Sequence, residues 1–451
     1  MFSVTEMLAL IGVLLVVVFS GTHIAVALGI TAALGIYFMQ GDIEIVRNFV
    51  AQTAYEALRD YVFAVIPLFM LMGEFLAKCG AAKDMYVLIN RLTRMVPGRL
   101  AVATVLANAI FAFVTGVSIA AAAAFSRIAY PEMKRHGYDR KFAVGCIAGS
   151  ACLGMLIPPS VLMIVWGILT EQSIGQLFIA GITPGFLLSG AFIVYIIAVA
   201  VLRPERVGGA RRAAAAGVPN DAPAVPVLAD REFLRILFGT LLVIALVLGV
   251  LAGIWLGAFT PTEGAGVGAA LALVVAIVKG LRLREIFEAI LSVGRTSAPI
   301  LLLLVCAQLY ARVLSMTGIT GAAKALFLQA GVSPWEILAV MVLIWFVLGC
   351  VIDSISILLI TVPVFVPIAT ALGFDPLAFA IIGILAVETG LLTPPFGILV
   401  FTVKAALPEE KDMAVGEIFR GAVPYWIALL TVIVCIAVFP QIATWLPNLG
   451  R

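Results

Sequence analysis

The sequence predicts an all-α membrane protein that crosses the bilayer many times and consists of two inverted-topology repeats. Three observations lead to this fold class. The chain is 63% hydrophobic and only 12% charged, with a mean hydropathy of +1.18, whereas a soluble domain carries about a quarter charged residues. It also resembles itself at a constant offset, and two proline pairs interrupt apolar segments that are long enough to span a bilayer.

Long uncharged segments are the first of these signals. They include Met7–Phe19, Ile24–Met39, Phe238–Leu256 and Ala339–Cys350. The longest of them exceeds the roughly 18 residues that cross a bilayer. Because no basic region precedes the first apolar run, we expect a first span there and not a cleaved signal peptide.

The net charge of +3 is not gathered into one basic patch, so no nucleic-acid partner is predicted. The six cysteines form no close pair, which favours a packing role.

The internal repeat is visible at an offset of 236 residues. The matching pairs are Ser118 and Ser354, Pro131 and Pro367, Gly137–Asp139 and Gly373–Asp375, and Gly154–Pro159 and Gly390–Pro395. We therefore predict a first repeat over residues 1–203 and a second over 232–451. Residues 204–231 are rich in Ala, Pro and Arg and cannot bury a core, so they are expected to form a cytoplasmic linker.

Lysine and arginine placement predicts the orientation, because cytoplasmic segments carry an excess of these residues. We assume a periplasmic N-terminus, and five crossings plus one re-entrant hairpin in each repeat. On this arrangement 22 of the 28 basic residues are cytoplasmic and five are periplasmic. An odd number of crossings inverts the second repeat and makes both termini periplasmic. Inverted repeats are typical of secondary transporters, which bind their solute at mid-membrane between the two halves.

Two broken helices are predicted, at about residues 140–170 and 376–404. Pro158-Pro159 interrupts the first (the first break) and Pro394-Pro395 the second (the second break), because proline lacks the backbone N–H and clashes with the preceding turn. Backbone freed at bilayer depth is tolerated only where protein buries it or where it lines a wet cavity. A simple proline kink is the alternative.

A re-entrant hairpin is predicted before each break, at about residues 100–130 and 336–368. The first turns at Thr115–Ser118 (the first tip) and the second at Gly349–Ser354 (the second tip). Helix N-termini favour anions and carbonyl ends favour cations, while hydroxyl and carbonyl oxygens suit a hard cation such as sodium. The expected solute-binding residues are Thr115, Ser118, Arg127, Ser160, Ser354 and Thr393. Sodium is expected near Gly116, Ser118, Gly154, Pro158, Gly349, Asp353, Gly390, Thr393 and Pro394.

Charged residues inside the apolar segments are candidates for function, because a charge at bilayer depth is costly unless it is paired or hydrated. Arg127 could attract a solute carboxylate, or it could extend toward the cytoplasmic surface. Asp353 could bind a cation or cap the returning helix of its hairpin. Glu263 is expected to cap a helix after Thr-Pro-Thr, and Glu388 to orient the second break.

Several motifs resemble those of a known family, the large membrane subunit of tripartite ATP-independent periplasmic (TRAP) transporters. They are Pro131–Met133, Gly137–Arg140, Leu156–Ser160, Phe259–Glu263, Gly373–Pro376 and Glu388–Gly397. The resemblance covers nearly the whole chain. The first tip departs from the family's usual Ser-Gly-Ser-Ser, Ala121 replaces a usual threonine, and Arg127 stands where a small residue is usual.

The resemblance implies an elevator mechanism driven by a sodium gradient, in the bacterial inner membrane. It also implies a small four-span membrane subunit and a soluble periplasmic binding protein that delivers a carboxylate-bearing solute. Sodium ions would act as coupling ions, without a resident cofactor.

Two other function classes compete with this one. A stand-alone ion-coupled carrier or anion exporter of the same broad superfamily would share the hairpins and repeats but would need no binding protein. An intramembrane enzyme is not expected, because the sequence holds no HExxH, no GxSxG, no paired intramembrane aspartates and no phosphate loop.

Overall fold

The computed structural model describes residues 4–208, 230–318 and 332–449, and these residues form helices joined by short turns. Within these ranges, eight helical segments are long and apolar enough to cross a membrane. The all-α polytopic class predicted from composition is therefore confirmed. The predicted linker begins with a short 3-10 turn, η2 (Pro204–Arg206). Most of the rest of that linker, together with Lys324 and Arg451 of the charge count, lies outside the described residues.

In the described residues, the first repeat begins with five α-helices and one short 3-10 helix and ends with a hairpin, a broken helix and a long helix. Its elements are α1 (Val4–Phe19), α2 (Ile24–Gln40), α3 (Ile43–Arg59), η1 (Tyr61–Ala64), α4 (Val65–Lys78), α5 (Ala81–Leu92), α6 (Arg99–Thr115), α7 (Ser118–Arg135), α8 (Arg140–Ala151), α9 (Leu153–Leu156), α10 (Val161–Thr170) and α11 (Ile174–Leu202). Asp139 caps α8 by accepting a hydrogen bond from the Phe142 amide, as aspartate does at many helix starts. Gly116, in the left-handed region, ends α6.

The second repeat has the same order of hairpin, broken helix and long helix. Its elements are α13 (Asp230–Trp255), α14 (Pro261–Val278), α15 (Leu283–Thr317), α17 (Pro334–Gly349), α18 (Ser354–Ala371), α19 (Pro376–Gly390), α20 (Ile398–Ala406), α21 (Val415–Val438) and α22 (Gln441–Leu449). Asp375 caps α19 as Asp139 caps α8, one repeat offset earlier. Glu263 forms a capping box with Thr260 at the start of α14, which is the capping role expected for it.

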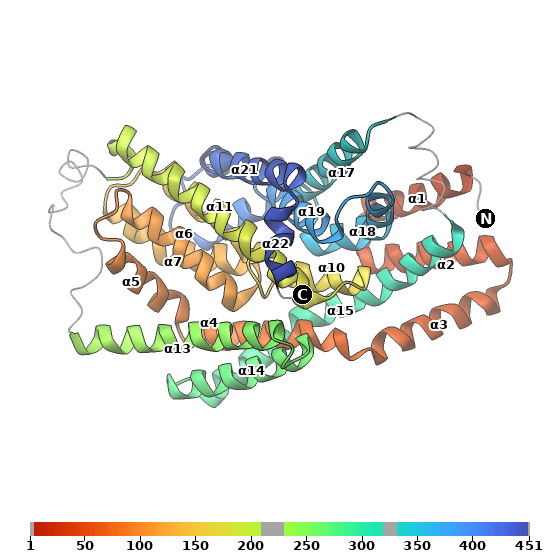
Figure 1. Cartoon of the computed structure of the whole chain (residues 1–451), viewed down its shortest axis with the longest axis horizontal. Coiled ribbons are helices and arrows are strands. Elements are labelled where there is room, and N and C mark those ends of the chain that lie inside the picture. Colours follow the sequence, from red (N-terminus) through yellow and green to blue (C-terminus); the bar gives the residue numbers. More distant parts are fainter. Residues whose placement is uncertain (1–3, 209–229, 319–331, 450–451) are drawn as a thin grey trace.

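The two hairpins enter the molecule from opposite ends. Figure 1 shows α6 and α7 in the left half of the view and α17 and α18 in the right half, with their tips directed toward the centre. This opposed arrangement is what inversion of the second repeat requires. A second group of helices lies beside the hairpins: α4 packs against α14 and α15, and α2 packs against α15.

Packing between the repeats is reciprocal. The long helix α21 packs on α8 and the long helix α11 packs on α19, while α10 packs on α18 and α20 on α7. Each broken helix therefore contacts the hairpin and the long helix of the other repeat. Glycines bring α8 and α21 together: a Cβ on Gly145 would lie 2.2 Å from the Gly421 backbone, and one on Gly421 would lie 2.1 Å from the Lys141 carbonyl oxygen.

Candidate functional site

The first tip is in direct backbone contact with the first break. The Val161 amide, at the start of α10, donates a hydrogen bond to the Gly116 carbonyl oxygen over 3.3 Å. A Cβ on Gly116 would lie 2.2 Å from the Pro159 carbonyl oxygen, and one on Gly154 would lie 3.0 Å from the Ser118 backbone. Gly116 has a φ of +61°, which other residues rarely adopt. Glycine is therefore required at this contact for both shape and conformation.

The second tip contacts the second break in the same way. The Phe396 amide donates to the Cys350 carbonyl oxygen over 3.2 Å. A Cβ on Gly390 would lie 2.5 Å from the Gly349 Cα atom. Thr393 donates its hydroxyl to the Gly390 carbonyl oxygen at 2.9 Å, and its Oγ1 lies 2.9 Å from the Cys350 Sγ. We call each hairpin tip, together with the helix break that follows it in the sequence, a half-site.

Glu388 joins the two half-sites. Its side chain is only 1% exposed. The Ser118 hydroxyl donates to Oε2 at 2.7 Å and the Ser354 hydroxyl donates to Oε1 at 3.3 Å. The Cys152 thiol donates to the Glu388 carbonyl oxygen at 3.8 Å, and these two residues are themselves one repeat offset, 236 residues, apart.

Glu388 was predicted only to orient the second break, so its contact with both tips was missed. A single carboxyl in an otherwise apolar helix was the available signal, because such residues default to a functional role in membranes.

Several predicted site residues direct their polar groups to local backbone. Ser160 caps α10 by accepting from the Met163 amide at 3.4 Å, and donates to the Met155 carbonyl oxygen at 2.5 Å. The Thr115 hydroxyl donates to the Phe111 carbonyl oxygen at 3.2 Å. Asp353 is exposed and caps α18, with its Oδ1 accepting from the Ser356 amide at 3.0 Å.

Arg127 is not brought to the hydroxyl groups of the tips. It is exposed on α7, nine residues beyond the buried Ser118, which corresponds to about 13 Å along an α-helix. The adjacent Ser126 is buried and donates to its own helix. The structure therefore groups Ser118 with Ser354 and Glu388, and leaves Arg127 on the outer face of the hairpin.

The two breaks differ in exposure. Residues 151–160 around the first break are all buried, whereas Pro394 and Pro395 are exposed and Phe396 is 56% exposed. In the described ranges no group of three or more His, Cys, Asp or Glu side chains could hold a metal ion. The Ser160 and Thr393 hydroxyls and the backbone carbonyls at the breaks carry oxygen atoms of the kind that hard cations prefer.

The whole chain can now be compared with known proteins. Residues 11–442 match the model of the family described as "Tripartite ATP-independent periplasmic transporter, DctM component". The chain belongs to this family. The resemblance drawn from the motifs is thereby confirmed.

Other DctM-family proteins match over nearly their full length. The C4-dicarboxylate TRAP transporter large permease protein DctM of Pseudomonas aeruginosa is 34% identical over 94% of both chains. The sialic acid TRAP transporter large permease protein SiaM of Vibrio cholerae is 28% identical over 89% of this chain and 90% of its own. This DctM-family chain is accordingly a transporter permease subunit and not an enzyme.

A solved structure shares the fold of this DctM-family chain. The crystal structure of the Alcanivorax borkumensis YdaH transporter, described as having an unusual topology, superposes with a TM-score of 0.61 at 15% identity. It covers 90% of this chain and 89% of its own. At that identity the likeness concerns the fold alone.

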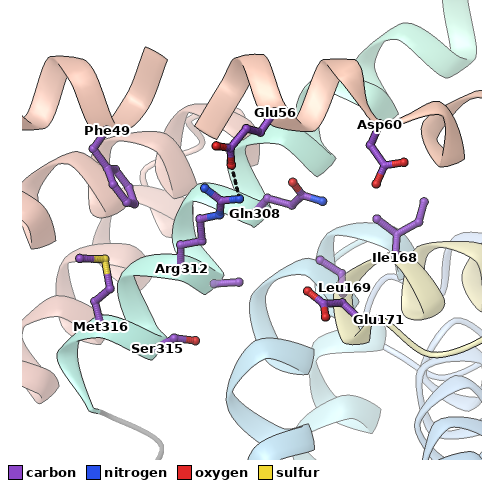
Figure 2. A pocket seen from close by; sticks show the side chains of 11 residues that line it. Phe49, Glu56, Asp60, Ile168, Leu169, Glu171, Gln308, Arg312, Ser315 and Met316 are labelled. Atoms are coloured by element: carbon purple, nitrogen blue, oxygen red, sulfur yellow. Dashed lines mark hydrogen bonds and ion pairs between the residues drawn. The ribbon is translucent and has the colours of Figure 1, made fainter. Parts of the chain in front are cut away.

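A cavity of about 700 Å³ separates α10 from α3 and α15. Figure 2 shows Arg312 of α15 paired with Glu56 of α3, while Glu171 and Leu169 at the end of α10 face them. Arg312 donates to Glu56 at 2.5 Å. Glu171 has a φ of +56°, rare for a residue other than glycine. In this DctM-family chain, the C-terminal end of the first broken helix therefore borders open space.

Proposed function

We propose that the chain is the transport-catalysing subunit of a sodium-coupled, binding-protein-dependent importer of small carboxylate-bearing solutes, working by an elevator mechanism. The observation that carries this proposal is that both hairpin tips, each in contact with its own helix break, are joined through the buried Glu388. Broken helices of this kind form solute and ion sites in secondary transporters.

The helix ends at this region have the polarity that such a site needs. Ser118 and Ser354 are the first residues of α7 and α18, so the positive ends of two helix dipoles lie near the centre. The last turns of α9 and α19 lie against the tips, since Gly154 of α9 is close to Ser118 and Gly390 of α19 is close to Gly349. Amide ends favour a carboxylate and carbonyl ends favour a cation, which supports co-transport of an organic anion with sodium.

An elevator needs one group of helices that can slide against another. The hairpins, the broken helices, α11 and α21 pack on one another reciprocally, and we propose that they form the moving body. The cavity of about 700 Å³ between α10 and the helices α3 and α15 gives this body room to move. We propose that α2–α4 and α13–α15 form the static part.

Membership of the family supports a proposal about the partners. We propose a small four-span membrane subunit, which binds the static helices in the bacterial inner membrane, and a soluble periplasmic protein that delivers the solute. The relatives are named for C4-dicarboxylate and for sialic acid. Both are carboxylate-bearing solutes, which supports the proposed class without naming one member.

Reconstitution tests the proposal. The chain and its small subunit are placed in liposomes, and uptake of a solute that the partner receptor binds is measured with and without an inward sodium gradient. We expect uptake that requires both the gradient and the receptor. Uptake that ignores sodium would refute the coupling, and uptake without the receptor would favour a stand-alone carrier.

A further inference from the structure

The Glu388 side chain is hydrogen-bonded to both hairpin tips. Ser118 begins α7 and Ser354 begins α18, so each hydroxyl moves with the returning helix of its own hairpin. Both hydroxyls donate to the carboxyl group of Glu388, one to each oxygen atom. Among the described residues, no other hydrogen bond joins the first tip to the second. A change at one tip can therefore reach the other through this carboxyl group.

The carboxyl group has few other partners. Glu388 lies on α19, which packs against α17, α21, α11 and α18. Within the described part of the chain, the Cys152 thiol bonds the backbone carbonyl of Glu388. No Lys, Arg or His in these residues forms an ion pair with the Glu388 carboxyl group. A buried polar group without partners is costly, because it has lost water and gained nothing in return. The buried carboxyl group therefore favours both serine hydrogen bonds, and the loss of either bond loosens the contact between Glu388 and the two tips.

The repeat explains why one residue does this for both halves. Ser118 and Ser354 are repeat equivalents, and the equivalent of Glu388 in the first repeat is Cys152, which contacts the Glu388 backbone. The four residues thus meet where the two repeats meet. A single carboxyl group in place of two symmetric ones makes the two tips depend on the same acceptor.

We propose that Glu388 is a positioning residue that couples the two hairpin tips, so that the two half-sites open and close together. Its importance for transport rests on the proposed function, whereas the coupling itself is a property of the folded chain. It can therefore be measured without solute, sodium or partner proteins.

Hydrogen exchange of the full chain in lipid nanodiscs measures the coupling directly. Glu388→Met keeps the approximate side-chain volume but replaces the two carboxyl oxygens with a weakly accepting sulfur, whereas Glu388→Gln retains one acceptor oxygen and adds a donor. We expect Glu388→Met to speed amide exchange at both tips by roughly tenfold, the effect of losing a hydrogen bond to a buried carboxyl group. Glu388→Gln should restore most of the protection at both tips. Equal exchange in the two variants would overturn the proposal.

A cycle with the serines separates coupling from local damage. Ser118→Ala should speed amide exchange at the second tip as well as at the first. In the Glu388→Met background, the same substitution should have no further effect on exchange at the second tip. Ser189→Ala is the matched control, since this buried hydroxyl donates only within its own helix, to the Gly185 carbonyl oxygen at 2.8 Å; it should leave both tips unchanged. If Ser118→Ala acts only on the first tip, Glu388 does not couple the hairpins. Since no transport is measured, this outcome is independent of whether sodium drives uptake.

Discussion

Ser118 and Asp353 stand at the two hairpin tips and provide different chemistry there. Ser118 is buried and donates to Glu388 at 2.7 Å, whereas Asp353 is exposed and caps α18. Asparagine caps a helix about as well as aspartate. Asp353→Asn therefore removes the charge and keeps the cap, so it can test cation binding without unravelling the helix.

We expect Ser118→Ala and Asp353→Asn to raise the sodium concentration needed for half-maximal uptake, each on the order of tenfold, with little change in expression. If sodium binds at the tips as proposed, the first variant loses an oxygen ligand and the second loses a negative charge. Sodium activation curves in reconstituted liposomes provide the measurement, with Ser189→Ala as the control. If both variants keep the activation of the parent chain, the hairpin tips do not hold sodium.

The tip and break residues could be predicted from the sequence because their signals are local. Proline pairs, flanking glycines and small hydroxyl residues determine nearby backbone on their own, and the offset of 236 residues matched them in pairs. The contact between Ser118 and Glu388 spans 270 positions. Nothing local encodes it, because it depends on how the two opposed hairpins dock. The exposure of Arg127 likewise depends on how the two hairpins dock and is not encoded by its neighbours in the sequence.

At the scale of elements, α8 and α21 show how two long helices approach closely. Gly145 and Gly421 face each other, and a Cβ on Gly145 would lie 2.2 Å from the Gly421 backbone. Small residues at such contacts are typical of membrane helices, where packing replaces the hydrophobic effect as the force that joins them. The bidentate pair of Arg140 with Glu417, at 2.8 Å for both bonds, aligns the ends of the same two helices.

Gly145→Ala is expected to destabilise the chain by about 1–3 kcal/mol, because the added methyl group forces the two backbones apart. Gly190→Ala is the control: Gly190 is exposed in α11 with no atom within 4 Å of an added Cβ, so alanine should be neutral or stabilising there by about 0.5–1 kcal/mol. Thermal unfolding of the purified chain in detergent measures both. Equal unfolding temperatures in the two variants would contradict the close helix contact.

The first hairpin is also tied to the turn between α20 and α21. Lys134, at the end of α7, pairs with Glu410 in this turn and also holds the pKa of its carboxyl group below the usual 4.5. A lowered folded-state pKa means that the stabilisation is fully present above about pH 4.5 and is lost as the pH falls through the folded value. The turn should therefore loosen only in acid.

Limited proteolysis across the pH range from 7 to about 3, with an acid-tolerant protease, tests this contact. We expect cleavage between α20 and α21 to increase below about pH 4.5 in the parent chain. Lys134→Met should be cleaved more readily at neutral pH and should show a weaker pH dependence, because the largest cause of the lowered Glu410 pKa is removed. A parent chain that resists cleavage equally throughout would show that the pair does not hold the turn.

For the whole molecule, reciprocal packing means that neither repeat is complete alone. The broken helix of each half packs on the hairpin and the long helix of the other half. The sequence could predict the two repeats, because proline and glycine positions recur. It could not predict this exchange of contacts, which depends on packing between helices that lie far apart in the sequence. The arrangement brings Ser118, Ser354 and Glu388 together at the repeat interface, where inverted-repeat transporters bind their solutes.

Orientation in the membrane is a property of the whole chain, and the distribution of basic residues predicts it. The charge count gives 22 basic residues on the cytoplasmic side if the N-terminus is periplasmic. Glu44, at the start of α3, and Arg203, at the end of α11, are both exposed and lie on opposite sides in this scheme. In Figure 1 the α11 end and the α1–α3 region lie toward opposite ends of the long axis.

Single cysteines at these two positions, in a chain whose six native cysteines are replaced, allow the orientation to be measured in spheroplasts. A membrane-impermeant maleimide should label Glu44→Cys at once, and should label Arg203→Cys only after the membrane is opened with detergent. The reason is energetic: translocating the arginine-rich segments beside Arg203 opposes the charge bias that sets topology. The reverse labelling order would invert the predicted orientation, and with it the side of the membrane from which each hairpin tip is reached.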